Sequence, residues 1–314
     1  MLEVKDLKKY FSLRDGRQIR AVDGVSFQVQ QNEILGVVGE SGCGKSTLGR
    51  LILRLIEPDA GQVSFFGEKI TGISRSALRL KRKSMQMVFQ NPFSSFNPKI
   101  TIGGALMEVC RHYDMTESES KEKIDQLLND IGLSGDMLNS WSRELSGGQL
   151  QRLAIARAII GEPFLLIADE PLSSLDVSVQ AQLLNLLDDL RASRAMAMIF
   201  ISHDMTVIEY FCDKIAVMYM GRIMELIPAA ELSHNALHPY TLSLKASVPK
   251  LDVFKNFVEE KKEPIHGEMA NRTLIKGCPF AFRCLQAKPQ CAETLPELYE
   301  VSPGHWVRCF CCQS

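Results

Sequence analysis

The segment GESGCGKS, at residues 39–46, combines residue types that bind phosphate. It fits the pattern G-x-x-x-x-G-K-[ST] and lies between an apolar stretch typical of a strand and a segment typical of a helix. Glycines let the backbone turn its N–H groups toward phosphate oxygens, with the positive end of a helix behind them. Lys45 would add a point charge for the terminal phosphates, and Ser46 a hydroxyl ligand for Mg²⁺. The predicted phosphate-binding loop comprises Gly39, Ser41, Gly42, Cys43, Gly44, Lys45 and Ser46, followed by Thr47.

Two adjacent carboxylates, Asp169 and Glu170, follow the apolar run FLLIA. Ligands of open α/β sheets bind at the carboxyl ends of the strands, which is where this pair would lie. Asp169 suits the Mg²⁺ shell, because a hard cation prefers carboxylate oxygen. Glu170 would orient and polarise an attacking water as a general base. The pair alone is also typical of a solvated strand end, so the phosphate-binding loop is what favours a hydrolytic role.

A second anion site is predicted in ELSGGQLQRLAIARAII, at residues 144–160. Ser146 has the residue type of a helix N-cap, and a strong helix-forming segment without proline follows it. The free N–H groups of Gly147, Gly148 and Gln149 would add to the positive end of the helix dipole. Taken alone, the segment is more typical of an ordinary capped helix than of an anion site.

The elements that must position these residues follow an α/β pattern. Buried strands are predicted at residues 33–39, 163–169 and 197–202, and an amphipathic helix at residues 118–133. We interpret the polar, helical stretch from about residue 91 to 140, which contains this helix, as a helical subdomain inserted into the α/β core. Beyond Gly221 the strand signals fade, and residues 254–273 have the composition of a polar linker.

Composition limits the classes of protein to which the chain can belong. Its 314 residues can bury a substantial core, and 36 Lys and Arg nearly balance 37 Asp and Glu, so a general nucleic-acid-binding surface is not indicated. No secretory signal and no apolar run of membrane-spanning length is visible. We therefore expect a soluble, cytosolic chain whose thiols stay reduced.

The sequence LSGGQ in the second predicted anion site resembles the signature motif of ABC-type ATPases. The motifs described above also occur in the order typical of that family, over residues 1–230. The resemblance implies ATP as substrate with Mg²⁺. It also implies that two such domains pair head to tail, so that the signature of one contacts the γ-phosphate held by the loop of the other. Adenine would stack on Phe11, which matches the family register, with Tyr10 as the alternative.

The same resemblance implies roles for four further side chains. Gln90, in MVFQNP, would touch the metal ion and the attacking water and report to the membrane partner. Ser173 and Asp176, in SSLD, are similar to the D-loop. His203, in FISHD, is similar to the switch histidine that contacts the γ-phosphate. The catalytic residues implied are thus Glu170, His203 and Gln90.

The last quarter of the chain resembles a narrower group. LHPYTLSLKASVP and GCPFAFRCLQAKPQC resemble the segments that follow the ATPase in oligopeptide, dipeptide and nickel importers. The expected fold is therefore α/β, an ABC-type P-loop ATPase core at residues 1–90 and 162–230. A helical signature subdomain at 91–161 and a cysteine-rich C-terminal extension at 231–314 complete it.

Six of the nine cysteines lie in that extension. Cys278, Cys284, Cys291 and Cys309 lack the paired C-x-x-C spacing of common zinc modules, and spacing alone leaves zinc, an iron–sulfur cluster and unligated thiols open. The resemblance implies a 4Fe-4S cluster on these four cysteines, with Cys311 and Cys312 competing as the fourth ligand. We expect it to be a structural clip whose loss barely changes ATP affinity.

Together these features predict the ATP-hydrolysing subunit of a peptide importer. Nickel or metal-chelate import is the alternative, and a soluble non-transport ABC ATPase is disfavoured because the chain has no coiled-coil insertion and only one signature. The implied partners are a second, similar ATPase subunit in a heterodimer, two transmembrane permease subunits and an extracytoplasmic substrate-binding protein. The subunit would lie peripherally on the cytoplasmic face of the membrane.

Overall fold

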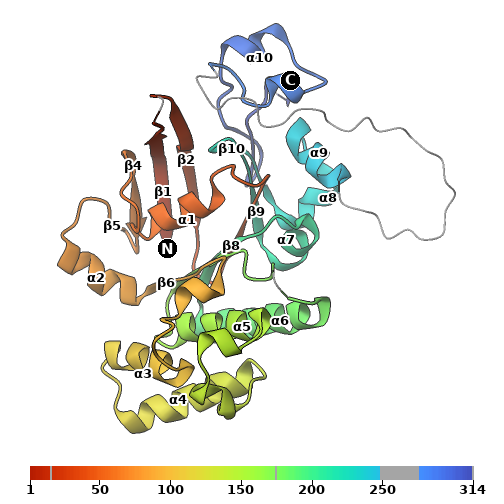
Figure 1. Cartoon of the computed structure of the whole chain (residues 1–314). Coiled ribbons are helices and arrows are strands. Elements are labelled where there is room, and N and C mark those ends of the chain that lie inside the picture. Colours follow the sequence, from red (N-terminus) through yellow and green to blue (C-terminus); the bar gives the residue numbers. More distant parts are fainter. Residues whose placement is uncertain (15, 174, 248–275, 313–314) are drawn as a thin grey trace, which may run out of the picture.

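Two β-sheets occupy the upper part of the molecule, and helices α3, α4 and α5 gather at its lower end (Figure 1). The structure is a computed structural model that describes residues 1–14, 16–173, 175–247 and 276–312. One sheet is antiparallel with the strand order β2-β1-β4-β5. The other has eight strands in the order β11-β12-β10-β9-β3-β8-β7-β6. The linker predicted at residues 254–273 lies outside the described residues.

The element bounds are as follows. The strands are β1 Leu2–Ser12, β2 Gln18–Val29, β3 Ile34–Val38, β4 Ala60–Phe65, β5 Glu68–Lys69, β6 Met85–Val88, β7 Leu165–Asp169, β8 Ala197–Ile201, β9 Lys214–Tyr219, β10 Arg222–Pro228, β11 Tyr299–Ser302 and β12 His305–Val307. The α-helices are α1 Lys45–Ile52, α2 Arg75–Lys83, α3 Ile102–His112, α4 Glu117–Asp130, α5 Gly147–Ile159, α6 Val177–Arg194, α7 Met205–Phe211, α8 Leu232–Asn235, α9 Pro239–Ala246 and α10 Pro289–Glu293.

The three strands predicted from apolar runs are confirmed as β3, β7 and β8, which pair in parallel at the centre of the larger sheet. Every residue in them is buried. Successive side chains point to opposite faces. Ile34 and Phe200 therefore join the apolar cluster that includes helices α3 to α7, whereas Leu35 and Ile199 join the cluster under the antiparallel sheet. Burial on both faces explains why these strands appear in the sequence as continuous apolar runs.

The helical segment between β6 and β7 contains the predicted amphipathic helix as α4. Its N-cap Thr116 forms a capping box with Glu119, with the Thr116 N–H donating to Glu119 Oε2 at 2.7 Å. Ile124, Leu127 and Leu128 face inward. The helix thus starts where its sequence supplies partners for the first free N–H groups and packs along its apolar stripe.

Strands continue beyond Gly221, although the strand signals in the sequence fade there. β10 begins at Arg222 and is buried over its central residues, and β12 pairs with it antiparallel. β11 then extends the same sheet. A charged residue in the middle of β10, Glu225, hides the strand pattern in the sequence, yet its side chain is fully buried.

Glu225 is buried because three groups satisfy its carboxylate. Oε1 accepts a hydrogen bond from the Leu237 N–H at 2.8 Å and lies 2.8 Å from His305 Nε2 of β12. Oε2 accepts from the His238 N–H at 3.2 Å. A buried carboxylate requires such partners, since an unpaired one is very costly. Glu225 therefore joins β10, the hairpin β11–β12 and the start of α9.

His238 gives this region a pH-dependent stability. Burial lowers its pKa to about 4, against the opposing attraction of Glu225, and its Nδ1 accepts the Tyr240 N–H at 3.0 Å. The unfolded chain binds a proton at this residue below about pH 6.5, whereas the folded chain does so only near pH 4. The stability is therefore present above pH 6.5 and is lost as the pH falls from there toward 4, by up to about 3 kcal/mol. Urea unfolding at pH 7.5 and pH 5 measures this loss.

The matched variant is His238→Asn, which keeps an N-cap acceptor and does not titrate. We expect its unfolding free energy to fall less between the two pH values than that of the wild type. Equal losses in both proteins would contradict the assignment to His238.

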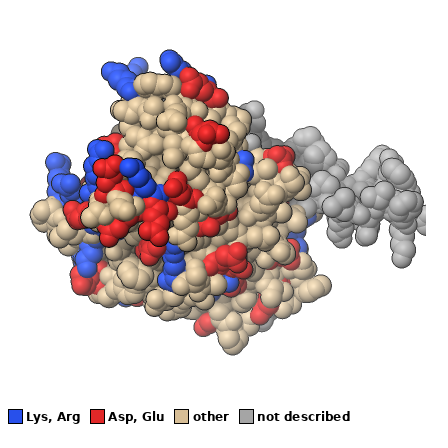
Figure 2. Space-filling view, turned by 90° about the horizontal axis from the view of Figure 1, so that it is seen from below, with Lys and Arg blue, Asp and Glu red and all other residues tan. Residues whose placement is uncertain are grey.

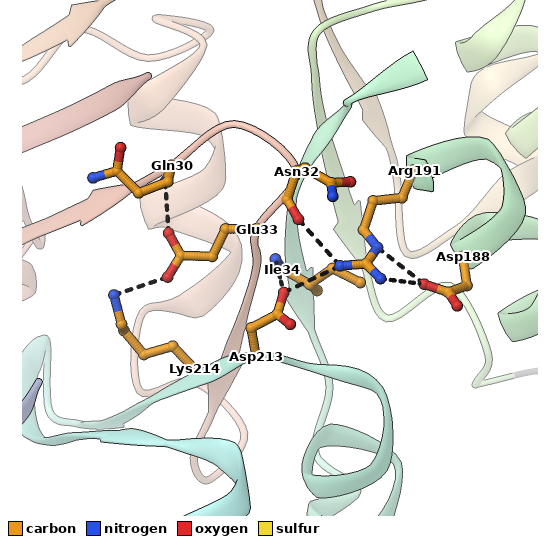
Figure 3. Close-up of polar contacts among 8 residues, drawn as sticks. All are labelled: Gln30, Asn32, Glu33, Ile34, Asp188, Arg191, Asp213 and Lys214. Atoms are coloured by element: carbon orange, nitrogen blue, oxygen red, sulfur yellow. Dashed lines mark hydrogen bonds and ion pairs between the residues drawn. The ribbon is translucent and has the colours of Figure 1, made fainter. Parts of the chain in front are cut away.

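A polar network fixes the start of β3 (Figure 3). The guanidinium of Arg191, in α6, contacts Asp188 Oδ1 at 2.8 Å and donates to the carbonyl of Asn32 at 3.1 Å. It also lies 3.4 Å from Asp213, whose Oδ2 accepts the Ile34 N–H at 2.7 Å. α6 and the strand that leads into the phosphate-binding loop are therefore held together.

The surface seen from below carries acidic and basic side chains intermixed with uncharged ones, so no field of a single sign covers that face (Figure 2). Among the described helices, none combines the length and the apolar character that a membrane span requires.

Candidate functional site

The glycine-rich loop connects β3 to α1, as the sequence predicts. Gly39 and Gly44 have positive φ angles of 152° and 114°. A Cβ atom at Gly44 would lie 2.0 Å from the carbonyl oxygen of Ala21, so only glycine fits there. Lys45 is buried, and its Nζ donates to the carbonyl oxygens of Gly39 at 2.7 Å and Glu40 at 3.1 Å. The loop therefore holds its own lysine in place.

Ser46 and Asp169 form the next part of the site. The Ser46 hydroxyl donates to Asp169 Oδ1 at 2.9 Å, although 123 residues separate them in sequence. Asp169 is fully buried, and within the described part of the chain its Oδ2 has no hydrogen-bond partner. Burial raises the pKa of Asp169. A buried, unpartnered carboxylate oxygen beside a hydroxyl fits a hard divalent cation, so this pair suits Mg²⁺.

Glu170 is the point at which the predicted catalytic residues meet. Gln90 Nε2 donates to Glu170 Oε2 at 3.3 Å, and His203 Nδ1 lies 3.4 Å from the same oxygen. Glu170 has a positive φ of 48°, which is rare for a residue with a side chain. Its N–H donates to the carbonyl of Ile201 at 2.9 Å, which fixes the turn after β7. Gln90, Glu170 and His203 therefore come together from three different strands' ends.

The segment predicted to be a second anion site forms the N-terminal cap of α5. Ser146 Oγ accepts the Gln149 N–H at 3.2 Å, and the Ser146 N–H donates to Gln149 Oε1 at 2.9 Å. In Figure 1, α5 lies in the lower helical group, whereas α1 lies beside the upper antiparallel sheet. Gly147 and Gly148 are only half-buried. The N-termini of α1 and α5, the two predicted phosphate-binding sites, therefore lie in different parts of the molecule.

Asp176 caps helix α6. Its Oδ1 accepts the Val179 N–H at 2.9 Å and the Ser178 hydroxyl at 2.6 Å. The Ser178 hydrogen bond holds the pKa of the Asp176 carboxyl below its usual range. Nearby, the Ser173 hydroxyl donates to the carbonyl of Glu170 at 3.1 Å. The segment predicted to be a D-loop is therefore attached to the turn that carries Glu170.

The two candidate adenine-stacking residues differ in their surroundings. Tyr10 is engaged, because its hydroxyl donates to Asp23 Oδ1 at 2.6 Å, and burial raises its pKa to about 12. Asp23 also pairs with Arg222 at 2.6 Å. Phe11 is 38% exposed and has Lys9 Nζ 5.7 Å from its ring centre. The geometry favours Phe11 as the ring that can accept a base.

Sequence reasoning missed a set of contacts between the phosphate-binding loop and the C-terminal tail. Glu40, inside the loop, is bound by Arg283 and by Tyr240. Arg283 lies 243 residues away from Glu40 in sequence, and neither its type nor its spacing marks it. The sequence predicts a cysteine-rich segment around Arg283 but no role for Arg283 itself.

The four-cysteine metal site is not supported. The Cys278 N–H donates to the Cys291 carbonyl at 2.7 Å, and the thiols of Cys284, Cys291 and Cys309 add to the raised pKa of Cys278. Burial contributes most and raises that pKa to about 11, which disfavours the thiolate. Hydrogen bonding by Cys312 lowers the pKa of Cys309. The described residues nevertheless contain no group of three or more His, Cys, Asp or Glu side chains placed to hold a metal ion.

Comparisons with known proteins match both parts of the chain. A family model described as ABC transporter matches residues 22–173, and one described as oligopeptide/dipeptide transporter, C-terminal region, matches residues 224–291. The chain is 44% identical to the oligopeptide transport ATP-binding protein AppF of Bacillus subtilis, over 98% of this chain and 96% of that protein. It is 42% identical to the oligopeptide transport ATP-binding protein OppF of Escherichia coli, over 98% of this chain and 95% of that protein.

Solved structures support the fold. The chain superposes on the dimeric, post-hydrolysis structure of the ATP-binding cassette MJ0796 bound to ADP and Pi, with a TM-score of 0.68 and 26% identity. That match covers 73% of this chain and 99% of the other. CbiO1 from Clostridium perfringens, part of the transporter complex cbiONQ, gives a TM-score of 0.65 at 25% identity, over 78% of this chain and 93% of the other.

Proposed function

Because this chain belongs to the ABC transporter family of ATP-binding proteins, we propose that it hydrolyses ATP and thereby powers the import of peptides through a separate membrane permease. The observation that carries this proposal is the identity of 40–44% with proteins named for oligopeptide transport, over almost the whole chain. The names of AppF and OppF refer to oligopeptide transport, which favours peptides over nickel as the cargo.

Each part of the site has a proposed task in hydrolysis. Lys45 and the loop N–H groups bind the phosphates, while Ser46 and Asp169 hold Mg²⁺, a Lewis acid that would offset charge on the phosphate oxygens. Glu170 accepts the proton of the attacking water. Gln90 and His203, each within about 3.4 Å of Glu170 Oε2, orient that carboxylate. Gln90 would also contact the metal ion and the attacking water, and His203 the γ-phosphate. Thr47, Ser41, Gly42 and Cys43 complete the binding loop by position.

The signature residues are proposed to act on a second subunit. The proposed anion site lies at the N-terminus of α5, where Ser146 is exposed and the next three residues are half-buried, away from the chain's own α1. Those three residues are Gly147, Gly148 and Gln149. The solved structure of the cassette MJ0796, which has the same fold, is a dimer. We therefore infer a head-to-tail pair, formed with a similar ATPase, in which this site meets the partner's nucleotide and Asp176 lies at the contact.

The further partners and the internal division follow from the same family membership. Two permease subunits would bind on the membrane side, an extracytoplasmic protein would deliver the cargo, and this subunit would lie on the cytoplasmic face. Within the chain, residues 1–90 and 162–230 would act as the nucleotide-binding core, 91–161 as the signature subdomain and 231–314 as the extension. The pairing of β12 with β10 means that this extension is built onto the core sheet.

Reconstituted transport tests the proposal. The complete transporter in proteoliposomes, with its binding protein, should hydrolyse ATP faster when di- or oligopeptides are supplied and should accumulate them inside. Stimulation by Ni²⁺ or a nickel chelate, without a response to peptides, would assign the alternative cargo. ATP hydrolysis without any coupled uptake would reject the transport function and leave a soluble ATPase.

Phe11→Ala is expected to weaken ATP binding by about tenfold, because one base–aromatic stack contributes about 1–3 kcal/mol. Tyr10→Phe is the matched variant. It removes the hydroxyl that binds Asp23 and leaves Phe11 in place, so ATP affinity should change little. Titration with a fluorescent ATP analogue measures both, and the reverse order of effects would place adenine on Tyr10.

A 4Fe-4S cluster on Cys278, Cys284, Cys291 and Cys309 stays a separate proposal. It is supported by the sequence resemblance of this cysteine-rich segment, whereas no group of three or more ligand side chains among the described residues is placed to hold a metal ion. Iron, sulfide and zinc analysis of anaerobically purified protein tests it, and protein without iron would reject it.

A further inference from the structure

A contact between the C-terminal tail and the phosphate-binding loop goes beyond the proposed chemistry. Arg283 Nη1 lies 2.9 Å from both carboxylate oxygens of Glu40. The side chains of Arg283 and Glu40 are only 15% and 27% exposed. Glu40 is the second residue of the loop GESGCGKS. A residue of the tail is therefore ion-paired inside the phosphate-binding loop.

A second tail residue holds the backbone of the same loop position. The Glu40 N–H donates to the hydroxyl of Tyr240 at 2.9 Å, and Tyr240 is fully buried in α9. The Glu40 carbonyl in turn accepts from Lys45 Nζ at 3.1 Å. Arg283 and Tyr240 thus fix the side chain and the N–H of the residue whose carbonyl helps to hold the phosphate-binding lysine.

The Arg283 side chain has its own supports. Its guanidinium lies 5.8 Å from the ring centre of Tyr219 and 5.7 Å from that of Phe280, and Nη1 also lies 3.3 Å from the Tyr219 hydroxyl. The Glu40 carboxylate is the largest cause of the raised pKa of Arg283. The rings of Tyr219, Tyr240 and Phe280 contact one another, with centroids 4.6–5.4 Å apart. This aromatic cluster joins the tail to the strand beside β3.

The backbone around Arg283 is held by the cysteine-rich turn. The Ala281 N–H donates to the carbonyl of Cys278 at 3.0 Å, and the Cys284 N–H to the carbonyl of Ala281 at 3.3 Å. Arg283 therefore lies in a short helical turn between two cysteines. The placement of this turn sets the placement of the guanidinium.

We propose that Arg283 is a positioning residue for ATP binding: it neutralises and orients Glu40, and so makes phosphate affinity depend on the fold of the C-terminal tail. The inference rests on the proposed function, since it concerns the same nucleotide site. An unpaired Glu40 carboxylate would place a negative charge within the loop that must accept phosphate oxygens. Under this inference ATP affinity depends on the tail, whereas from the sequence we expect loss of the predicted cluster to change that affinity barely.

A double-mutant cycle on the full-length chain tests the coupling. The dissociation constant of a fluorescent ATP analogue is measured for the wild type, Arg283→Ala, Glu40→Gln and the double variant. Arg283→Ala should raise the constant by about tenfold, because it leaves a partly buried charge without its partner. In the Glu40→Gln background the same substitution should have a much smaller effect, since the charge to be neutralised is gone.

Two controls separate positioning from general damage. Lys276→Ala removes a positive charge from the same segment at an exposed position and should leave the affinity unchanged. Arg283→Lys keeps the charge and should restore most of the affinity. Arg283→Ala and Phe11→Ala should have additive effects, because they act at opposite ends of the nucleotide.

The outcomes distinguish this inference from the proposed function. A wild-type chain that fails to bind ATP, or a Lys45→Ala variant that binds as well as the wild type, would overturn the proposed function. A wild type that binds, with Arg283→Ala binding equally well, would overturn only the positioning role. Equal losses from Arg283→Ala with and without Glu40→Gln would show that Arg283 acts on the fold and not through Glu40. If Arg283→Ala does not fold, Glu40→Gln and Arg283→Lys still decide the case.

Discussion

Glu170→Gln is expected to slow ATP hydrolysis by about 100-fold or more while ATP binding persists. The substitution removes the proton acceptor but keeps the shape of the side chain and its place after β7. The loop, Lys45 and the Ser46–Asp169 pair are untouched, so the phosphates should still bind. The protein should also accumulate as an ATP-bound, closed dimer, because opening would require hydrolysis.

Turnover of the assembled transporter and nucleotide affinity of the isolated chain measure these two effects separately. Glu162→Gln is a suitable control, because Glu162 is a carboxylate paired with Lys123 and Arg194 and belongs to no part of the site. It should leave turnover near that of the wild type. Near-normal turnover of the Glu170 variant would contradict the assignment of the general base.

The core of the site could be predicted from sequence because local signals specify it. The loop at residues 39–46 joins a buried strand to a helix, and Asp169 ends another such strand, with Glu170 directly after it. Parallel strands bring their carboxyl ends to one edge of the sheet, so the loop and the carboxylates had to meet. The contact between Ser46 and Asp169 is the direct result.

The choice between Tyr10 and Phe11 could not be made from sequence. The two aromatic residues are adjacent, and a shift of the pairing register occurs between Lys9 and Tyr10. The structure distinguishes them because the Tyr10 hydroxyl is hydrogen-bonded to Asp23, which is itself paired with Arg222 from β10. A partner so distant in sequence leaves no local signal.

The tail was the least predictable part for a related reason. Glu225 breaks the apolar pattern of β10, and its burial depends on His305 and on backbone groups near His238. Each of these groups comes from a different segment. Likewise, the contact of Arg283 with Glu40 depends on how the tail packs against the core, which spacing and composition do not encode.

Ser146→Arg is expected to reduce hydrolysis at the partner subunit's nucleotide by about 100-fold or more. A long cation at the N-cap of α5 would displace the anion site from a neighbouring phosphate, and misplacement by about 1 Å can cost such a factor. Nucleotide binding to this chain's own loop should be nearly unchanged, because Ser146 caps α5 whereas Lys45 begins α1, and the two helices lie apart in Figure 1. Turnover is measured in the complete transporter and affinity in the isolated chain.

Ser146→Ala is the matched variant, because it also removes the hydroxyl that accepts the Gln149 N–H. Loss of such a cap costs about 1 kcal/mol, so both variants should be destabilised to a similar degree, with a small further cost for a cation at a helix N-terminus. Hydrolysis should nevertheless fall much further in the arginine variant, since only there does a bulky side chain occupy the anion site. If the isolated Ser146→Arg chain instead loses ATP affinity by a large factor while Ser146→Ala does not, Ser146 faces the nucleotide of its own subunit, and the head-to-tail arrangement proposed for this protein is wrong.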